Sequence, residues 1–199
     1  MSKLSPQARR LAQTRQDIIQ NARRILVEEG PAGLSIRTLA DSIDYTPGAL
    51  YKYFSSKEEM IDAVRADCLQ RLNAFIAARI QAASSAADML LIGGMAYIEY
   101  AELQPQEYHL MFNMEPSKAT SGEERETAMQ TLLQIVQLGL EQGEFVTGGA
   151  YDAAAIAYHC WATVHGMASL HTAVLRDERH DLLSVSGVIL QKVIDGFKA

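Results

Sequence analysis

Three helix-start signals lie close together in residues 34–57, and they restrict this stretch to short helices separated by sharp turns. Ser35 and Thr46 are residue types whose side-chain oxygens cap the first N–H groups of a helix. Pro47 follows Thr46 at the first helical position, where the missing proline N–H does no harm. Ser56 is a further capping residue, placed before a long segment of apolar periodicity. The stretch therefore predicts two short helices joined by a tight turn, followed by the start of a longer helix.

The rest of the chain has the apolar spacing of helices and no sustained alternation typical of strands. Hydrophobic residues make up 48% of the 199 residues and charged residues 21%, which is typical of a globular chain. We expect an all-α fold with about nine helices, a capping box formed by Ser56 and Glu59, and a polar loop at residues 116–122. The expected helices lie approximately at residues 9–29, 36–43, 47–54, 56–82, 86–102, 105–112, 121–142, 151–175 and 182–197.

Charge is distributed unevenly along the chain. Residues 1–55 contain eight Lys and Arg against five Asp and Glu, a net charge of +3, whereas the remaining residues contain ten against nineteen, a net charge of −9. A basic first part suits contact with phosphates, and an acidic remainder does not. Chance unevenness is the alternative explanation of the charge pattern taken alone.

Residues 153–175 form a run of 23 residues without Asp, Glu, Lys or Arg. The run is long enough to span a bilayer, but its His, Thr and Ser side chains are costly against lipid. We therefore expect a helix buried in a core or at a subunit interface, and no membrane partner. Cys68 and Cys160 lie far apart and are expected to be buried thiols in a reducing cytoplasm, with no signal peptide.

The short helices of residues 34–57 have the organisation of a helix-turn-helix, whose second helix lies in the major groove of DNA. Small and apolar residues at the start of that helix allow close approach to base edges, and Tyr and Lys side chains reach phosphates. The N-termini of the flanking helices present free N–H groups to phosphates as well. The candidate DNA-binding residues are Ser35, Arg37, Thr46, Pro47, Gly48, Ala49, Tyr51, Lys52, Tyr53 and Lys57. A helical hairpin with half-buried tyrosines is the alternative.

The same stretch resembles the DNA-binding signature of the TetR family of bacterial transcriptional regulators. Three motifs carry the resemblance, Arg37-Thr-Leu-Ala40, Thr46-Pro-Gly-Ala-Leu-Tyr-Lys-Tyr-Phe54 and Ser56-Lys-Glu-Glu-Met60. Asp44 and Tyr53 differ from the family pattern. The family commonly has Gly in the turn, where this chain has Asp44, and frequently has His where this chain has Tyr53. Asp tolerates left-handed backbone better than most residues, so we expect the turn to form at some energetic cost.

The resemblance implies an N-terminal DNA-binding domain and a C-terminal helical domain for ligand binding and dimerisation. We place these domains at residues 1–57 and 58–199, with the helix from residue 56 connecting them. A cytoplasmic, ligand-responsive repressor is implied, with a palindromic operator in double-stranded DNA and an unidentified small-molecule effector as partners. The uncharged and apolar stripes of the last two helices predict a homodimer through those helices. An activator, or a small-molecule-binding protein that does not use its helix-turn-helix for repression, is the alternative.

Trp161 and His165 lie four residues apart on one face of the long uncharged helix. Residues 108–112 and 161–166 resemble patterns of a TetR subgroup with a Trp-His-Gly signature. Aromatic and polar side chains on one buried face are typical of a small-molecule pocket. The candidate pocket residues are Tyr97, Tyr100, Met111, Phe112, Tyr158, Trp161, His165 and Ser169. A hydrogen-bonded core histidine is the alternative for His165, and core packing is the alternative for the aromatic and Met side chains.

Catalytic and metal chemistry are not expected. His159, His165 and His171 are six residues apart, so successive side chains point about 240° apart around a helix and do not converge on one ion. The sequence contains no Glu-x-x-His pair of the di-iron type, no Gly-rich phosphate loop and no Ser-centred nucleophile elbow. We therefore expect no enzyme activity, no cofactor and no metal.

Overall fold

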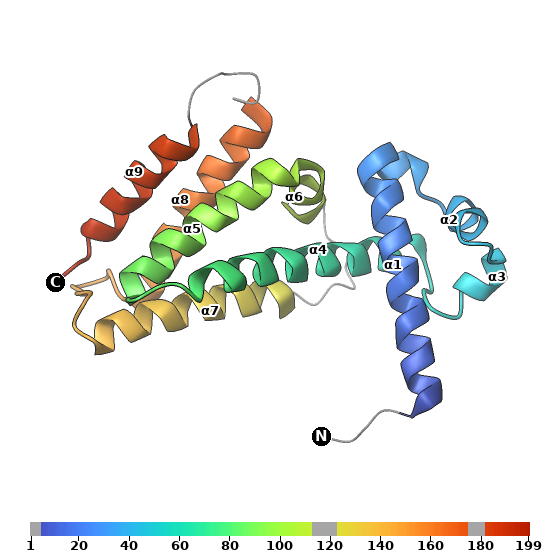
Figure 1. Cartoon of the computed structure of the whole chain (residues 1–199), viewed down its shortest axis with the longest axis horizontal. Coiled ribbons are helices and arrows are strands. Elements are labelled where there is room, and N and C mark those ends of the chain that lie inside the picture. The colour runs from blue at the N-terminus through green and yellow to red at the C-terminus, as the bar shows by residue number, and fades with distance from the viewer. Residues whose placement is uncertain (1–4, 113–122, 175–181) are drawn as a thin grey trace. The chain divides into compact units, whose positions relative to one another are not determined.

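The computed structural model of the chain describes residues 5–112, 123–174 and 182–199, and these residues form nine α-helices, one short π-helix and no multi-residue strand. The sequence prediction of an all-α fold is therefore confirmed for the described residues (Figure 1). The expected loop at residues 116–122 and the expected helix start at Ser121 lie outside them. The helices are α1 (Pro6–Gly33), α2 (Ile36–Ser42), α3 (Pro47–Leu50), α4 (Lys57–Ile80), α5 (Ala86–Leu103), α6 (Pro105–Phe112), α7 (Glu123–Glu141), α8 (Ala153–Ser169), the π-helix η1 (Leu170–Val174) and α9 (Leu182–Asp195).

The helices divide into two compact units. The first unit consists of residues 1–68 with 109–121, and the second consists of residues 69–108 with 122–199, so α4 and α6 each contribute to both. The functional boundary that we expect after residue 57 concerns the roles of the two parts, and it stays a prediction.

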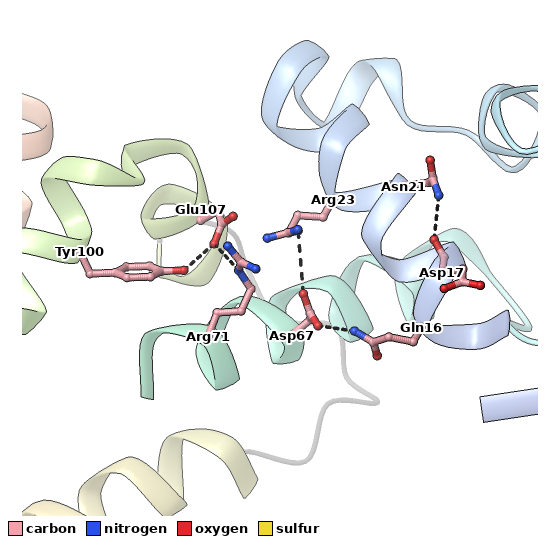
Figure 2. Close-up of polar contacts among 8 residues, drawn as sticks. All are labelled: Gln16, Asp17, Asn21, Arg23, Asp67, Arg71, Tyr100 and Glu107. Carbon is pink, nitrogen blue, oxygen red and sulfur yellow. Dashed lines mark hydrogen bonds and ion pairs between the residues drawn. The ribbon is translucent and has the colours of Figure 1, made fainter. Parts of the chain in front are cut away.

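A large part of the core of the first unit is built by α1, α2, α3 and the segment that follows α3. Fully buried apolar side chains come from each of these elements, as their helical spacing predicts: Ile18, Ala22, Ile25, Leu26, Leu39, Leu50 and Phe54. Ile43, which follows α2, is only half-buried. Asp67 on α4 fixes α1 from the other side, because it accepts a hydrogen bond of 2.7 Å from Gln16 and lies 3.9 Å from the Arg23 guanidinium (Figure 2).

The capping side chains start two of the short helices where the sequence predicts. The Ser35 hydroxyl accepts a 3.0 Å hydrogen bond from the Thr38 N–H, and the Thr38 hydroxyl accepts one of 2.9 Å from the Ser35 N–H. The Thr46 hydroxyl accepts a 3.3 Å hydrogen bond from the Ala49 N–H. These bonds satisfy N–H groups that have no partner inside their helices, so the ends of α2 and α3 are fixed locally.

The capping box expected at the start of α4 differs in one partner. The Ser56 hydroxyl accepts a 3.1 Å hydrogen bond from the Glu59 N–H as predicted. The Glu59 carboxylate, however, accepts hydrogen bonds from the N–H (2.7 Å) and hydroxyl (2.6 Å) of Ser55. Ser55 offers two donors to one carboxylate, and these bonds lower the pKa of Glu59.

The turn between α2 and α3 depends on left-handed backbone at Asp44. Its φ is 56°, and it is the one residue other than Gly with positive φ among the described part of the chain. The Tyr45 N–H after it donates to the Ala40 carbonyl at 2.9 Å, which closes the end of α2. The expected cost at this position follows from the Cβ atom, which crowds the backbone in the left-handed region.

Replacing Asp44 tests this turn. Asp44→Val is expected to lower the free energy of unfolding by about 1–2 kcal/mol, because a β-branched side chain is strained at positive φ. Asp44→Gly is expected to stay within about 0.5 kcal/mol of the wild type or above it, since glycine adopts this backbone freely. Urea denaturation measures both. The matched control is Asp41→Val on the exposed surface of α2, and an equal loss in the control would contradict the assignment of strain to Asp44.

In the second unit α5 packs against α7, α8 and α9. Gly94 on α5 permits this approach, because a Cβ atom there would collide with the Leu190 side chain on α9 and lie 3.0 Å from Val164 on α8. The helix expected over residues 151–175 is less regular than predicted, since α8 ends at Ser169 and the π-helix η1 follows it. No described helix is both long and apolar enough to cross a membrane.

Candidate nucleic-acid interface and effector site

The second helix of the helix-turn-helix is shorter than the sequence predicts. We expected it to reach Phe54, but α3 ends at Leu50. The Lys52 and Tyr53 N–H groups donate to carbonyls three residues back, at 3.3 and 2.9 Å, which tightens the backbone after the first turn. Phe54 still donates to the Leu50 carbonyl at 3.1 Å, so the buried anchor at spacing four is retained.

The start of α3 presents an open surface. Thr46, Pro47 and Gly48 are exposed, Ala49 is half-buried and Leu50 points into the core. A Cβ atom added at Gly48 would meet nothing within 4 Å. This surface therefore leaves room for another molecule to approach the backbone closely.

Side chains that can reach phosphates surround this surface. The Tyr51 side chain is 57% exposed, Lys52 and Arg37 are exposed, and Tyr53 is half-buried. The Ser35 hydroxyl is already engaged as the cap of α2. Lys57 donates a 2.9 Å hydrogen bond from Nζ to the Pro31 carbonyl, so it ties the start of α4 to the segment before α2. All ten candidate DNA-binding residues belong to the first unit, and their contact with DNA stays a prediction.

The candidate effector residues of the second unit meet at His165 on α8. The hydroxyls of Tyr97 on α5 and Tyr108 on α6 each lie 2.9 Å from His165 Nδ1. Tyr108 also lies 3.2 Å from the Ser169 hydroxyl and donates to the His165 carbonyl at 3.3 Å. The Trp161 ring stacks on the imidazole with a centroid distance of 5.5 Å. We call Tyr97, Tyr108, Trp161, His165 and Ser169 the His165 cluster.

The two phenols of the His165 cluster share one imidazole nitrogen. Burial raises the pKa of Tyr97 and of Tyr108, so both hydroxyls keep their protons at neutral pH. A nitrogen that accepts hydrogen bonds has one lone pair, so the two phenols compete for Nδ1. Tyr108 has Ser169 and a backbone carbonyl as further partners. More than one hydrogen-bond arrangement is therefore available to the cluster.

The other predicted pocket residues do not join the His165 cluster. Tyr100 donates a 2.5 Å hydrogen bond to Glu107, which Arg71 also contacts at 3.3 Å (Figure 2). Met111 is fully buried and Phe112 half-buried, and both belong to the first unit. Tyr158 is 63% exposed and makes an edge contact with the Trp161 ring.

Tyr108 is the central residue that sequence reasoning left out of the candidate pocket. The motif at residues 108–112 indicated this segment, but the pocket residues predicted from it were Met111 and Phe112. The helical spacing from Pro105 places position 108 on the same face as the buried positions 107 and 111. Only the packing of α6 beside α5 and α8 brings its hydroxyl to His165.

His159, His165 and His171 have separate partners, as their spacing of six residues predicts. His159 lies 2.7 Å from the Tyr151 hydroxyl, and His171 lies 2.7 Å from Glu102. No group of three or more potential metal-binding side chains occurs among residues 5–112, 123–174 and 182–199. Cys68 and Cys160 are buried free thiols, and burial raises the pKa of Cys160 to about 11.

Removal of the Tyr108 hydroxyl is expected to destabilise the protein. Tyr108→Phe removes a partner of the Ser169 hydroxyl and one of the two phenols at His165 Nδ1, so the free energy of unfolding should fall by about 1–2 kcal/mol. Chemical denaturation measures this change. Tyr158→Phe is the matched control, because its exposed side chain should tolerate the same change within about 0.5 kcal/mol. Equal stability of the two variants would show that the Tyr108 hydroxyl contributes nothing.

An all-α fold with an exposed helix-turn-helix defines a DNA-binding transcriptional regulator. The chain belongs to the TetR family: residues 18–64 match the model for bacterial regulatory proteins of the tetR family, and residues 90–178 match the tetracyclin repressor-like C-terminal domain. These matches do not establish the Trp-His-Gly subgroup, which stays a prediction.

Individual relatives agree with this family. The HTH-type transcriptional repressor AcnR of Corynebacterium diphtheriae is 31% identical over 67 residues, which span 34% of this chain and 35% of the relative. A protein of unknown function from Rhodococcus sp. RHA1 has the same fold, with a TM-score of 0.80, 24% identity and coverage of 93% and 95% of the two chains. The ketosteroid transcriptional regulator KstR2 of Mycobacterium tuberculosis has a TM-score of 0.61, 20% identity and coverage of 94% and 95%.

Proposed function

We propose that this protein is a ligand-responsive transcriptional repressor that binds a palindromic operator as a homodimer. The exposed start of α3, flanked by Tyr51, Lys52 and Arg37, is the observation that carries the proposal. Such a surface fits the major groove, where small residues approach base edges and the flanking side chains contact phosphates. One helical turn reads few bases, so two copies are needed for a specific site.

Apolar residues on α9 support the homodimer. Val185, Val188 and Ile189 are 52%, 62% and 42% exposed in the single chain and share one face of the helix. Tyr158 is exposed on the adjacent α8. Leu170 is exposed as well, at the start of η1, which follows α8. Because α8 and α9 pack against each other, these residues suit a two-fold interface in which four helices come together.

The His165 cluster is the proposed point of effector contact. It combines an indole, an imidazole and two protonated phenols, which offer stacking surfaces and hydrogen bonds without a formal negative charge. An effector that favours one of the available hydrogen-bond arrangements shifts the population of the second unit. Release of DNA follows if that arrangement is the one with weaker operator affinity.

DNA binding is tested by electrophoretic mobility shift with the intergenic region upstream of the gene, and the protected sequence is then mapped by footprinting. A palindromic footprint and lower reporter expression in the presence of the protein are expected. No shift at low salt under any condition would contradict the proposal, and raised reporter expression would identify an activator.

Effector binding is tested by thermal shift against a metabolite library, followed by operator release with each compound that raises Tm. His165→Ala should lose the Tm shift and the release while retaining operator binding. Release that is unchanged in His165→Ala and in Trp161→Ala would exclude the His165 cluster as the effector site.

A further inference from the structure

The N-terminal part of α1 is an exposed basic helix. Residues 6–14 contain no buried position, and the buried face of α1 begins at Ile18. In Figure 1 this dark blue part of α1 continues well beyond the segment that packs with α2. Nine helical residues extend about 13 Å. The family match begins at residue 18, so this part of α1 lies outside the matched residues.

Arg9 and Arg10 give the exposed helix an uncompensated positive charge. Both side chains are exposed, and neither has an ion-pair partner among the described residues. Residues 5–16 contain no Asp or Glu. The nearest acid on α1, Asp17, accepts a 2.9 Å hydrogen bond from Gln13. Neither guanidinium group therefore forms an ion pair that would stabilise the described part of the first unit.

Arg15 holds this helix beside the segment that follows α3. Its guanidinium lies over the Phe54 ring, 4.8 Å from the ring centroid, and Phe54 directly follows the turn after α3. Leu11, one turn before Arg15, is 55% exposed on the side that α1 turns toward the core of the first unit. The basic helix therefore begins beside the end of the α3 segment and runs outward from it.

We propose that residues 6–14 form a second DNA-binding element, which contacts the sugar–phosphate backbone through Arg9 and Arg10 beside the bases read by α3. Arginine suits this role because its planar guanidinium donates paired hydrogen bonds to phosphate oxygens. The proposal rests on the proposed function in taking DNA as the partner, and it extends the contact surface beyond the helix-turn-helix.

The test compares Arg9→Gln/Arg10→Gln with a control of equal charge, Arg24→Gln/Lys198→Gln. Arg24 is exposed farther along α1 and pairs with Glu28, and Lys198 is exposed after the end of α9 and pairs with Asp195. Fluorescence anisotropy measures the affinity of each full-length variant for a mixed-sequence duplex of about three helical turns across a salt series. A duplex of arbitrary sequence suffices, because phosphate contacts do not depend on sequence. Circular dichroism and Tm establish that the variants are folded.

The slope of log K against log salt is expected to fall in magnitude by about two per bound protomer in Arg9→Gln/Arg10→Gln and to stay near wild type in the control. Between 50 and 200 mM salt, the double variant should then lose about tenfold less affinity per protomer than the wild type. Slopes that agree between the variant and the control would overturn the inference. Loss of binding to anionic phospholipid vesicles with unchanged DNA affinity would overturn it too, in favour of a membrane contact. If the wild type binds no duplex at any salt, the proposed function itself fails.

Discussion

Gly48→Glu is expected to abolish DNA binding while the protein stays folded. Position 48 has space for a side chain, because a Cβ atom there meets nothing within 4 Å, so the unfolding free energy should change by less than about 0.5 kcal/mol. A carboxylate at the start of α3 would face phosphates in the complex, and like charges in contact cost several kcal/mol. We therefore expect operator affinity to fall by at least about 100-fold, which corresponds to about 2.7 kcal/mol.

The matched control for Gly48→Glu is Glu placed at an open glycine of the second unit, Gly148→Glu. A Cβ atom at Gly148 also meets nothing within 4 Å, so the control adds the same charge without steric conflict. Fluorescence anisotropy with the footprinted operator measures both variants at fixed salt, because affinity for DNA depends on salt. Operator affinity of Gly48→Glu within threefold of the control would exclude α3 as the reading element.

Val188→Asp is expected to convert the proposed homodimer to a monomer. The Val188 side chain is 62% exposed in the single chain, so the fold of one protomer should tolerate Asp. In a two-fold interface the change occurs twice, so it places two carboxylates in the apolar contact. An unpaired buried charge costs about 2–5 kcal/mol at an interface, so the dimer Kd should rise by at least about 100-fold. Operator affinity should fall with it, because each protomer would then bind one half-site alone.

Analytical ultracentrifugation across a concentration series measures the dimer Kd. Val146→Asp is the matched control, since Val146 is 50% exposed in the same unit but lies on the segment between α7 and α8. A Val188→Asp protein that stays dimeric at the concentrations where the control is dimeric would exclude this face of α9 as the interface.

Sequence reasoning predicted the fold well where local signals decide the structure. Ser35 and Thr46 cap α2 and α3 as expected, because a cap depends on residues only three positions apart. Asp44 was identified as the strained turn residue for the same reason, and its φ of 56° confirms this. The length of α3 was wrong, since nothing in residues 47–54 marks the change to shorter hydrogen bonds after Leu50.

Contacts between distant segments could not be predicted in the same way. Tyr100 is a predicted pocket residue, and the sequence did not indicate that its hydroxyl donates to the buried Glu107. The pattern of aromatic residues indicated that α5 and α8 carry a mixed polar and aromatic face, and it did not indicate which hydroxyl would reach His165.

The sequence by itself determined the all-α class and the helix-turn-helix, because capping residues, a turn and helical periodicity act over a few residues. Only the tertiary structure decided which side chains share a site. Tyr97, Tyr108 and His165 come from three helices, and their 2.9 Å contacts depend on how those helices pack. The same is true of Arg15, whose contact with the Phe54 ring places the basic end of α1 beside α3. Such distances depend on the interlocking of many side chains across the core, which periodicity in one segment does not specify.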